Sequence, residues 1–205
     1  MTSSASALAF ALGSVLAMTR PAAASSVDEL LASAERHMAA GEEEIALRRY
    51  TDALTLDPTC EACYLGLGAL REKRVDLREA DRVYTAALIR RVPPAGVLIA
   101  RARVRWAMGL REEALADLED SVSRQPGAEG LRRLAGYYGE LRMVPAQLRV
   151  ARQLLALGEK FGDDTIVREA RISSTALALV AGPADPVTQP VKPDPIRRAL
   201  AKAAR

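Results

Sequence analysis

Asparagine is absent from the 205-residue chain, and aromatic residues make up only 4% of it. Without Asn the chain has no N-glycosylation site and no motif that requires an Asn side chain. A sandwich or barrel is disfavoured, because such folds are rich in aromatic and β-branched residues. The apolar fraction of 49% excludes disorder along the whole chain. The 39 Ala and 27 Leu, both strong helix formers, therefore favour an all-helical protein.

The chain also has few residues suited to catalysis. Its single His, His37, has no Ser or Cys nucleophile with a second partner nearby, so we interpret it as a packing residue. The acidic run 42–44 lies where we expect a helix to begin, and carboxylates there stabilise the helix dipole. No glycine-rich phosphate loop occurs. We therefore expect no enzymatic activity, no metal site and no cofactor.

The N-terminal segment has the pattern of an export signal. Residues 7–18 form a 12-residue apolar run, which as a helix rises about 18 Å and is too short to cross a bilayer core of roughly 30 Å. Small residues at 22–24 match a cleavage site, so the sequence predicts a signal peptide over 1–24, cleaved after Ala24. The expected location is periplasmic or secreted, in a bacterium. Because no Lys or Arg precedes the run, the alternative is an N-terminal helix packed on the domain.

The C-terminal segment, 182–205, is rich in proline. Five of the 11 prolines lie in 183–195, which predicts an extended linker without a core of its own. Asp194 and Pro195 form a helix-start pattern, and an apolar face follows, flanked by four basic residues. We interpret this segment as a flexible tail with a short basic helix. The alternative is a weak contact of this tail with an anionic membrane or a partner groove.

The middle of the chain repeats with a period of 34 residues. At this spacing small residues recur in several columns and large apolar residues in two others. Such columns predict pairs of antiparallel helices, because small residues let two helix backbones approach and large ones fill the space beside them. The small columns are Ala34, Gly68, Ala102 and Gly136; Ala46, Ala80 and Ala114; and Ala53, Ala87 and Ser121; the large columns are Tyr50, Tyr84 and Leu118, and Leu30, Tyr64 and Leu98.

Turn and cap residues agree with this register. Gly41 and Gly109 occupy the same point in units one and three, where a turn between two helices is expected. Pro58 and Pro126 close the same two units, since proline cannot continue a helix. Ser26 with Glu29 reads as a capping box that begins the first helix, and Asp76 with Glu79 resembles one that begins the fourth.

These columns resemble the tetratricopeptide repeat, whose helix B carries Ala-x3-aromatic followed by Pro. The resemblance is clear over 27–127 and degenerate over 128–181. It implies an all-α, right-handed superhelical solenoid of antiparallel helix pairs. The matches are Tyr64, Leu67, Gly68, Ala80, Tyr84 and Ala87 in unit two; Ala46, Tyr50, Ala53 and Pro58 in unit one; and Leu98, Ala102, Ala114, Leu118 and Pro126 in unit three.

Unit four departs from the strict period. Sliding the register by one residue near 128–131 restores its apolar positions, which predicts a helical unit over 129–159. A further helix over about 164–181, with a mixed apolar face, suits the capping element that the exposed end of a solenoid needs. The solenoid domain is therefore predicted to span 25–181.

Cys60 and Cys63 form a C-x-x-C pair at the expected start of a helix. Tyr64 follows instead of His, which excludes attachment of a c-type haem, and no second Cys pair or nearby His completes a zinc set. In an exported protein the pair can close a small disulfide. A redox role is the alternative, because a helix N-terminus lowers the pKa of a thiol.

In tetratricopeptide arrays one face of the A helices lines an inner groove. The resemblance therefore implies a partner-binding groove, with an aromatic and cationic patch suited to a peptide that carries carboxylate and apolar groups. Chaperone-binding members grip a carboxylate with two Asn, so that clamp is absent here. The predicted groove residues are Glu72, Lys73, Arg103, Trp106, Arg133 and Tyr137, with Glu140 beside them.

The sequence thus predicts a non-catalytic scaffold that binds a protein or peptide partner, and the expected setting is an envelope or secretion assembly. The alternative is a thiol-active or disulfide-clipped protein that uses the C-x-x-C pair. The net charge of +3 comes from the ends, since 182–205 holds five basic and two acidic residues. The segment 25–181 holds 23 basic and 24 acidic residues in runs that alternate in sign. A basic face for nucleic acid is therefore not expected.

Overall fold

The computed structural model describes residues 26–181, and no strand is present within them. The predicted signal peptide and C-terminal tail lie outside these residues. The helices are α1 (Val27–Ala39), α2 (Glu43–Leu56), α3 (Glu61–Lys73), α4 (Leu77–Ile89), α5 (Pro94–Ala107), α6 (Arg111–Arg124), α7 (Ala128–Glu140), α8 (Val144–Phe161) and α9 (Asp164–Ala181).

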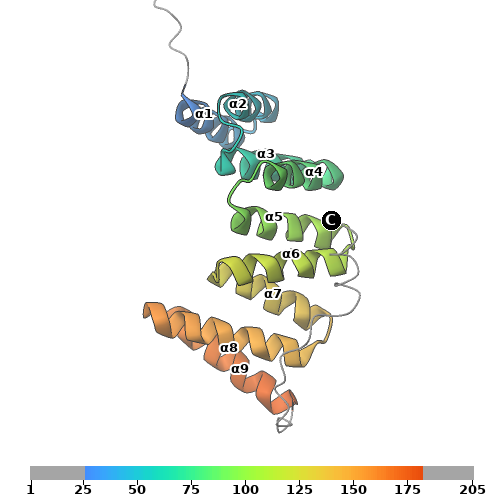
Figure 1. The fold of residues 1–205 in the computed structure, drawn as a ribbon, viewed down its shortest axis with the longest axis vertical. Coiled ribbons are helices and arrows are strands. Elements are labelled where there is room, and N and C mark those ends of the chain that lie inside the picture. Colours follow the sequence, from blue (N-terminus) through green and yellow to red (C-terminus); the bar gives the residue numbers. More distant parts are fainter. Residues whose placement is uncertain (1–25, 182–205) are drawn as a thin grey trace, which may run out of the picture.

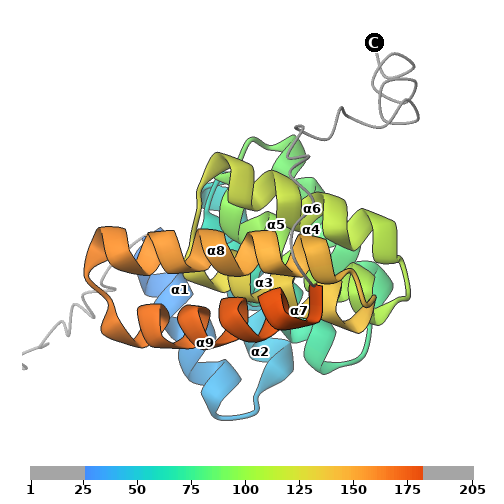
Figure 2. The same cartoon turned by 90° about the horizontal axis from the view of Figure 1, so that it is seen from below.

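The helices stack in chain order (Figure 1). Each odd-numbered helix pairs with the next one, so that α1/α2, α3/α4, α5/α6 and α7/α8 form four units, and each unit packs on its neighbours. The ninth helix lies beside α8 at the end of the stack (Figure 2). The predicted all-α solenoid of helix pairs with a terminal helix is confirmed. We call the first helix of each unit helix A and the second helix B.

The turns between helix A and helix B show the register directly. Each contains one residue in the left-handed region, with φ of 77° at Gly41, 61° at Val75, 81° at Gly109 and 56° at Arg142. The first three are spaced by 34 residues and the last by 33, which is the one-residue slip expected in unit four. The connection 125–127 has three residues, where 57–60 and 90–93 have four.

The joints between units are of two kinds. Helices α2 and α6 end on extended residues, Asp57 and Gln125. Helix α4 is followed instead by Arg91 with φ of 61°, and α8 by Gly162 with φ of 67°. The backbone conformation after a B helix is therefore extended in units one and three and left-handed in units two and four.

One of the two predicted capping boxes forms. At α1 the Ser26 hydroxyl accepts from the Glu29 N–H, and the Glu29 carboxylate accepts from the Ser26 N–H. At α4 the prediction was wrong, because Asp76 makes no side-chain hydrogen bond to the helix. Its backbone, with φ −87° and ψ 64°, lacks the extended geometry of a capping residue, and its carboxylate lies 3.9 Å from the Arg71 guanidinium.

Two glycines of α3 let tyrosines pack directly on the helix backbone. A Cβ added at Gly66 would lie 2.3 Å from Cζ of Tyr50, and one at Gly68 would lie 2.3 Å from Cε1 of Tyr84. No real Cβ approaches another atom so closely, so these positions must be glycine for the rings to lie where they do. The column of small residues facing large ones is thus a steric requirement in unit two.

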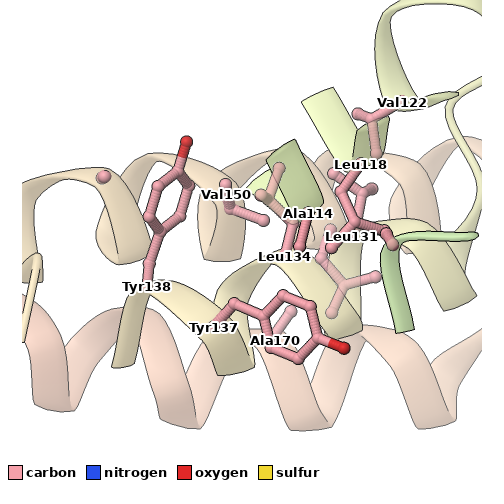
Figure 3. Packing of buried hydrophobic residues seen from close by; sticks show 12 residues of the cluster. Ala114, Leu118, Val122, Leu131, Leu134, Tyr137, Tyr138, Val150 and Ala170 are labelled. Carbon is pink, nitrogen blue, oxygen red and sulfur yellow. The ribbon is translucent and has the colours of Figure 1, made fainter. Parts of the chain in front are cut away.

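The largest core lies in the C-terminal half. Figure 3 shows it, with side chains from α6, α7, α8 and α9 meeting between the helices. Ala170 is the one α9 residue that is fully buried there among the described residues, and it anchors the terminal helix to unit four.

A buried ion-pair network joins units two and three. Asp117 of α6 is only 5% exposed and accepts two hydrogen bonds from Arg101, at 2.7 and 2.9 Å. Arg105 binds the same carboxylate at 3.0 Å and also donates to Asp81 of α4 at 2.9 Å. The loss of one member would leave a buried charge unpaired, at a cost of roughly 3–5 kcal/mol.

Replacement of Gly68 tests the steric requirement. We expect Gly68→Ala to lower the free energy of unfolding by about 1–3 kcal/mol, because the new methyl group collides with the Tyr84 ring. The matched control is Gly136→Ala in α7, where a Cβ meets nothing within 4 Å. That change should raise the free energy of unfolding by up to about 1 kcal/mol, since Ala is the better helix former.

Urea denaturation followed by circular dichroism measures both changes. Equal effects of the two substitutions would show that the Gly68–Tyr84 contact is not tight.

Candidate functional site

All six predicted groove residues, Lys73 of α3 included, lie on three successive A helices, and five of them follow one another across the units. Glu72 lies on α3, Arg103 and Trp106 on α5, and Arg133 and Tyr137 on α7. Contacts between them cross from one unit to the next, so they form a continuous strip, which we call the A-helix strip.

Trp106 lies at the centre of the A-helix strip. Its indole stacks on the Tyr137 ring, with ring centroids 3.7 Å apart and planes 6° from parallel. The Arg111 guanidinium lies 4.1 Å over the same indole. Because two groups cannot occupy one ring face, the indole lies between them. Its N–H donates to the Glu140 carboxylate at 3.1 Å, and the half-buried side chain presents only part of its edge to solvent.

Arg103 is already bound within the protein. It donates two hydrogen bonds to the Glu72 carboxylate, at 2.8 and 2.7 Å, and the Tyr84 hydroxyl donates to the same carboxylate at 2.7 Å. Burial raises the pKa of Tyr84, and the hydrogen bond to Glu72 raises it further. The hydrogen bonds that Arg103 donates to the Glu72 carboxylate raise the pKa of Arg103. A ligand carboxylate would therefore have to compete with Glu72 for this guanidinium.

Arg133 is the more available cation of the A-helix strip. Its Nη2 lies 3.1 Å from the carboxylate of Glu129, one turn away on the same helix, and the Glu129 side chain is 68% exposed. Such exposed pairs contribute little, about 0.3–0.5 kcal/mol. The Nε of Arg133 is buried and has no hydrogen-bond partner among residues 26–181. Burial raises the pKa of Tyr137, and Arg133 opposes that rise.

Lys73 makes its ion pair elsewhere. Its Nζ lies 2.9 Å from the Glu43 carboxylate of α2, which also binds Arg74 at 2.9 Å, while Arg74 reaches Glu44 at 2.8 Å. Hydrogen bonds from Lys73 and then from Arg74 lower the pKa of Glu43. These charges join units one and two, so the structure places Lys73 apart from the aromatic pair with which the sequence analysis grouped it.

Arg111 is the residue that the sequence analysis missed. It is the first residue of α6, and besides covering the indole it donates to the Trp106 carbonyl at 2.8 Å. The turn between α5 and α6 returns the chain toward Trp106, which makes a contact five residues away. The order of an aromatic residue, a turn and then a basic residue could have indicated the contact between Trp106 and Arg111.

Cys60 and Cys63 form a disulfide in the structure. Cys60 is the N-cap of α3, and its Sγ accepts from the Cys63 N–H at 3.2 Å. Cys63 is fully buried against unit one, whereas Cys60 is partly exposed. The bridge therefore closes the first turn of α3.

The remaining polar candidates have structural partners. His37 pairs with the Glu42 carboxylate across the turn between α1 and α2. Within residues 26–181, no group of three or more His, Cys, Asp or Glu side chains is placed to hold a metal ion. The helices of that region are all too short or too polar for a membrane crossing.

The arrangement of residues 26–181 defines a class: an α-helical repeat protein in which successive helix pairs stack on one another. No protein-family model matches the sequence, and no curated protein matches it significantly. Comparison with solved structures identifies the fold as that of tetratricopeptide repeat proteins, as the sequence predicts.

Three of these structures show the range. A tetratricopeptide repeat protein from Parabacteroides merdae matches 74% of this chain with a TM-score of 0.59 and 21% identity; the chain spans 59% of its length. YrrB, described as a TPR protein with an unusual peptide-binding site, matches 87% of this chain and 92% of its own, with a TM-score of 0.51 and 16% identity. PilW, described as a type IV pilus biogenesis factor, matches 73% and 77%, with a TM-score of 0.51 and 16% identity.

Fluorescence of Trp106, the sole tryptophan, tests the stacked pair. Tyr137→Leu removes one cover of the indole, so we expect the emission maximum to move to longer wavelength as water reaches that ring face. The matched control is Tyr138→Phe, because Tyr138 hydrogen-bonds to Glu119 and does not stack on Trp106. An unchanged spectrum for Tyr137→Leu would contradict the stacking.

Proposed function

We propose that the protein is a non-catalytic scaffold that binds a protein or peptide partner on the A-helix strip. The observation that carries this proposal is the stacked Trp106–Tyr137 pair, which joins two units. Beside it lies Arg133, whose ion-pair partner Glu129 is 68% exposed and whose Nε has no hydrogen-bond partner among residues 26–181. Tryptophan, tyrosine and arginine are the residue types that dominate binding energy at interfaces. Their contacts here fix the side chains before a partner arrives, which lowers the entropic cost of binding.

The chemistry of the strip selects a ligand with two features. A carboxylate of the ligand would bind Arg133, whose present partner Glu129 is largely exposed and easily displaced. An apolar side chain would pack on the edge of Trp106. Arg103 has a positioning role, because Glu72 and Tyr84 hold it in place between α3 and α5.

The wider setting that we propose is an envelope or secretion assembly. The export signal predicted over 1–24 and the structural likeness to PilW both support it. YrrB, which has the same fold, is described as having a peptide-binding site, and this supports a peptide or protein partner. We propose no nucleic-acid partner, and a weak contact of the 182–205 tail with a membrane or the partner stays a prediction.

A crosslinking pull-down of the exported protein tests the strip. We expect Trp106→Ala/Arg133→Glu to lose partner capture by about tenfold or more, since an anchor and a charge are both removed. The matched control is Arg48→Glu, an exposed arginine on α2 away from the strip. A second double variant, Trp106→Phe/Arg133→Glu, keeps an aromatic ring at position 106 and so guards against a loss that comes from misfolding. Circular dichroism checks the fold of each variant. Identical partners in wild type, control and double variants would remove this site.

A second candidate function is thiol–disulfide exchange. The observation in its favour is the placement of the partly exposed Cys60 at the N-terminus of α3, where a thiolate is stabilised. The scaffold function predicts that a disulfide-exchange assay gives the same rate for the wild type and for Cys60→Ser/Cys63→Ser. A rate well above that of the double variant, with a mixed disulfide trapped on Cys60, would establish the thiol function instead.

A further inference from the structure

A pocket of about 590 Å³ lies between α6 and α8, two successive B helices, with α7 as its floor. Its volume falls in the range of roughly 300–1,000 Å³ that is typical of ligand sites. Its lining is mainly apolar, with the polar side chains of Glu119, Ser123, Arg149, Gln153 and Lys160 beside the apolar ones, several of which are labelled in Figure 3. The apolar walls are Val122, Leu131, Leu134, Tyr138, Val150 and Leu157.

The preceding gap in the array is polar. Between α4 and α6 the corresponding hollow, of about 490 Å³, is lined by Arg101 and Asp117, which form an ion pair in its wall. At the 33-residue spacing that relates units three and four, the residues equivalent to this pair are Leu134 and Val150. Unit four therefore has apolar side chains at the positions where unit three has an ion pair, and these side chains give its pocket an apolar floor.

This pocket is separate from the A-helix strip. Tyr137 and Tyr138 are neighbours on α7, and Figure 3 shows their rings pointing in different directions. Tyr137 stacks on Trp106, whereas the Tyr138 ring lines the pocket and its hydroxyl donates to Glu119 at 2.6 Å. Burial raises the pKa of Tyr138 to about 12, and the hydrogen bond to Glu119 contributes to that rise.

The rim of the pocket favours a negatively charged ligand. Exposed Arg149 and Lys160 stand on one face of α8, eleven residues or about 16 Å apart. The acidic rim residue, Glu119, already accepts the Tyr138 hydrogen bond. Segment 195–205 of this chain is a poor occupant, because it carries four basic residues and no acidic one, so the cations on α8 would repel it.

We propose that this pocket is a second binding site, which takes the apolar side chains of an acidic amphipathic helix from another protein. A helix of about three turns matches the distance between the two cations, and its carboxylates would bind them while its apolar face covers the floor. The protein would then hold two partners, or two segments of one partner, on different sides of the same units.

Fluorescence anisotropy with synthetic peptides tests the chemistry of this pocket. The probe is a fluorescein-labelled helix of about 14 residues with Leu on one face and Glu on the other. One matched peptide has Lys for Glu, a second has Ser for Leu, and a third is segment 195–205. We expect the Leu/Glu peptide to bind at least about tenfold more tightly than each of the others at low salt.

Variants locate the binding. Arg149→Glu/Lys160→Glu should weaken the Leu/Glu peptide by about tenfold or more, and Ala156→Trp should do the same by filling the pocket. The matched control, Arg152→Glu/Arg168→Glu, makes the same charge change at exposed arginines outside the pocket and should leave affinity within about twofold. Trp106→Ala should have no effect, which separates this site from the A-helix strip.

Four outcomes would overturn the proposal. They are no binding of the Leu/Glu peptide up to roughly 1 mM, equal binding of the Lys peptide, an equal loss in the control variant, and tighter binding of segment 195–205. The last result would assign the pocket to the chain's own tail.

Discussion

The contact of the Tyr84 ring with the backbone at Gly68 is the constraint on which the centre of the molecule depends. It brings α3 and α4 together so closely that no Cβ fits between them. The hydroxyl at the far end of the ring donates a hydrogen bond to the Glu72 carboxylate. This carboxylate also accepts hydrogen bonds from Nε and Nη2 of Arg103 on the next unit. The packing of Tyr84 on Gly68 therefore also positions the hydrogen bonds through Glu72, and these hydrogen bonds order the A-helix strip.

Units three and four show how one fold gives two kinds of surface. In unit three the hollow beside the B helix is lined by Arg101 and Asp117, which form an ion pair with each other. In unit four the same positions are apolar, and the pocket there has a mainly apolar lining. A charged pair of this kind adds little net stability compared with apolar residues of similar size. Its effect here is on the chemistry of the hollow, whose wall is charged in unit three and apolar in unit four.

Most of the fold could be predicted from the sequence, because the columns of small and large residues report directly on which helix faces pack. The helix over 164–181 and the slip in unit four followed from the same columns. The partners of the polar residues could not be predicted. The sequence predicts that Lys73 and Arg103 lie on A helices, but it does not predict their ion-pair partners. Lys73 pairs with Glu43 and Arg103 with Glu72, because the partner depends on which carboxylate lies across the unit boundary. The role of Arg111 was missed and the cap at Asp76 was wrong for the same reason, since a polar side chain has several partners within reach.

The alternating turns suggest that the structural period is two units. Gly41 and Gly109 make the turns of units one and three, and those units end on extended residues, whereas non-glycine residues make the other turns and a left-handed residue follows those units. A valine or arginine in the left-handed region costs about 1–2 kcal/mol, so strain is concentrated in every second unit. Within residues 26–181, helices α1 to α8 accordingly form two blocks of four helices, each with one relaxed and one strained turn. Such a block, and not the single helix pair, is the natural module for duplicating, grafting or shortening this array.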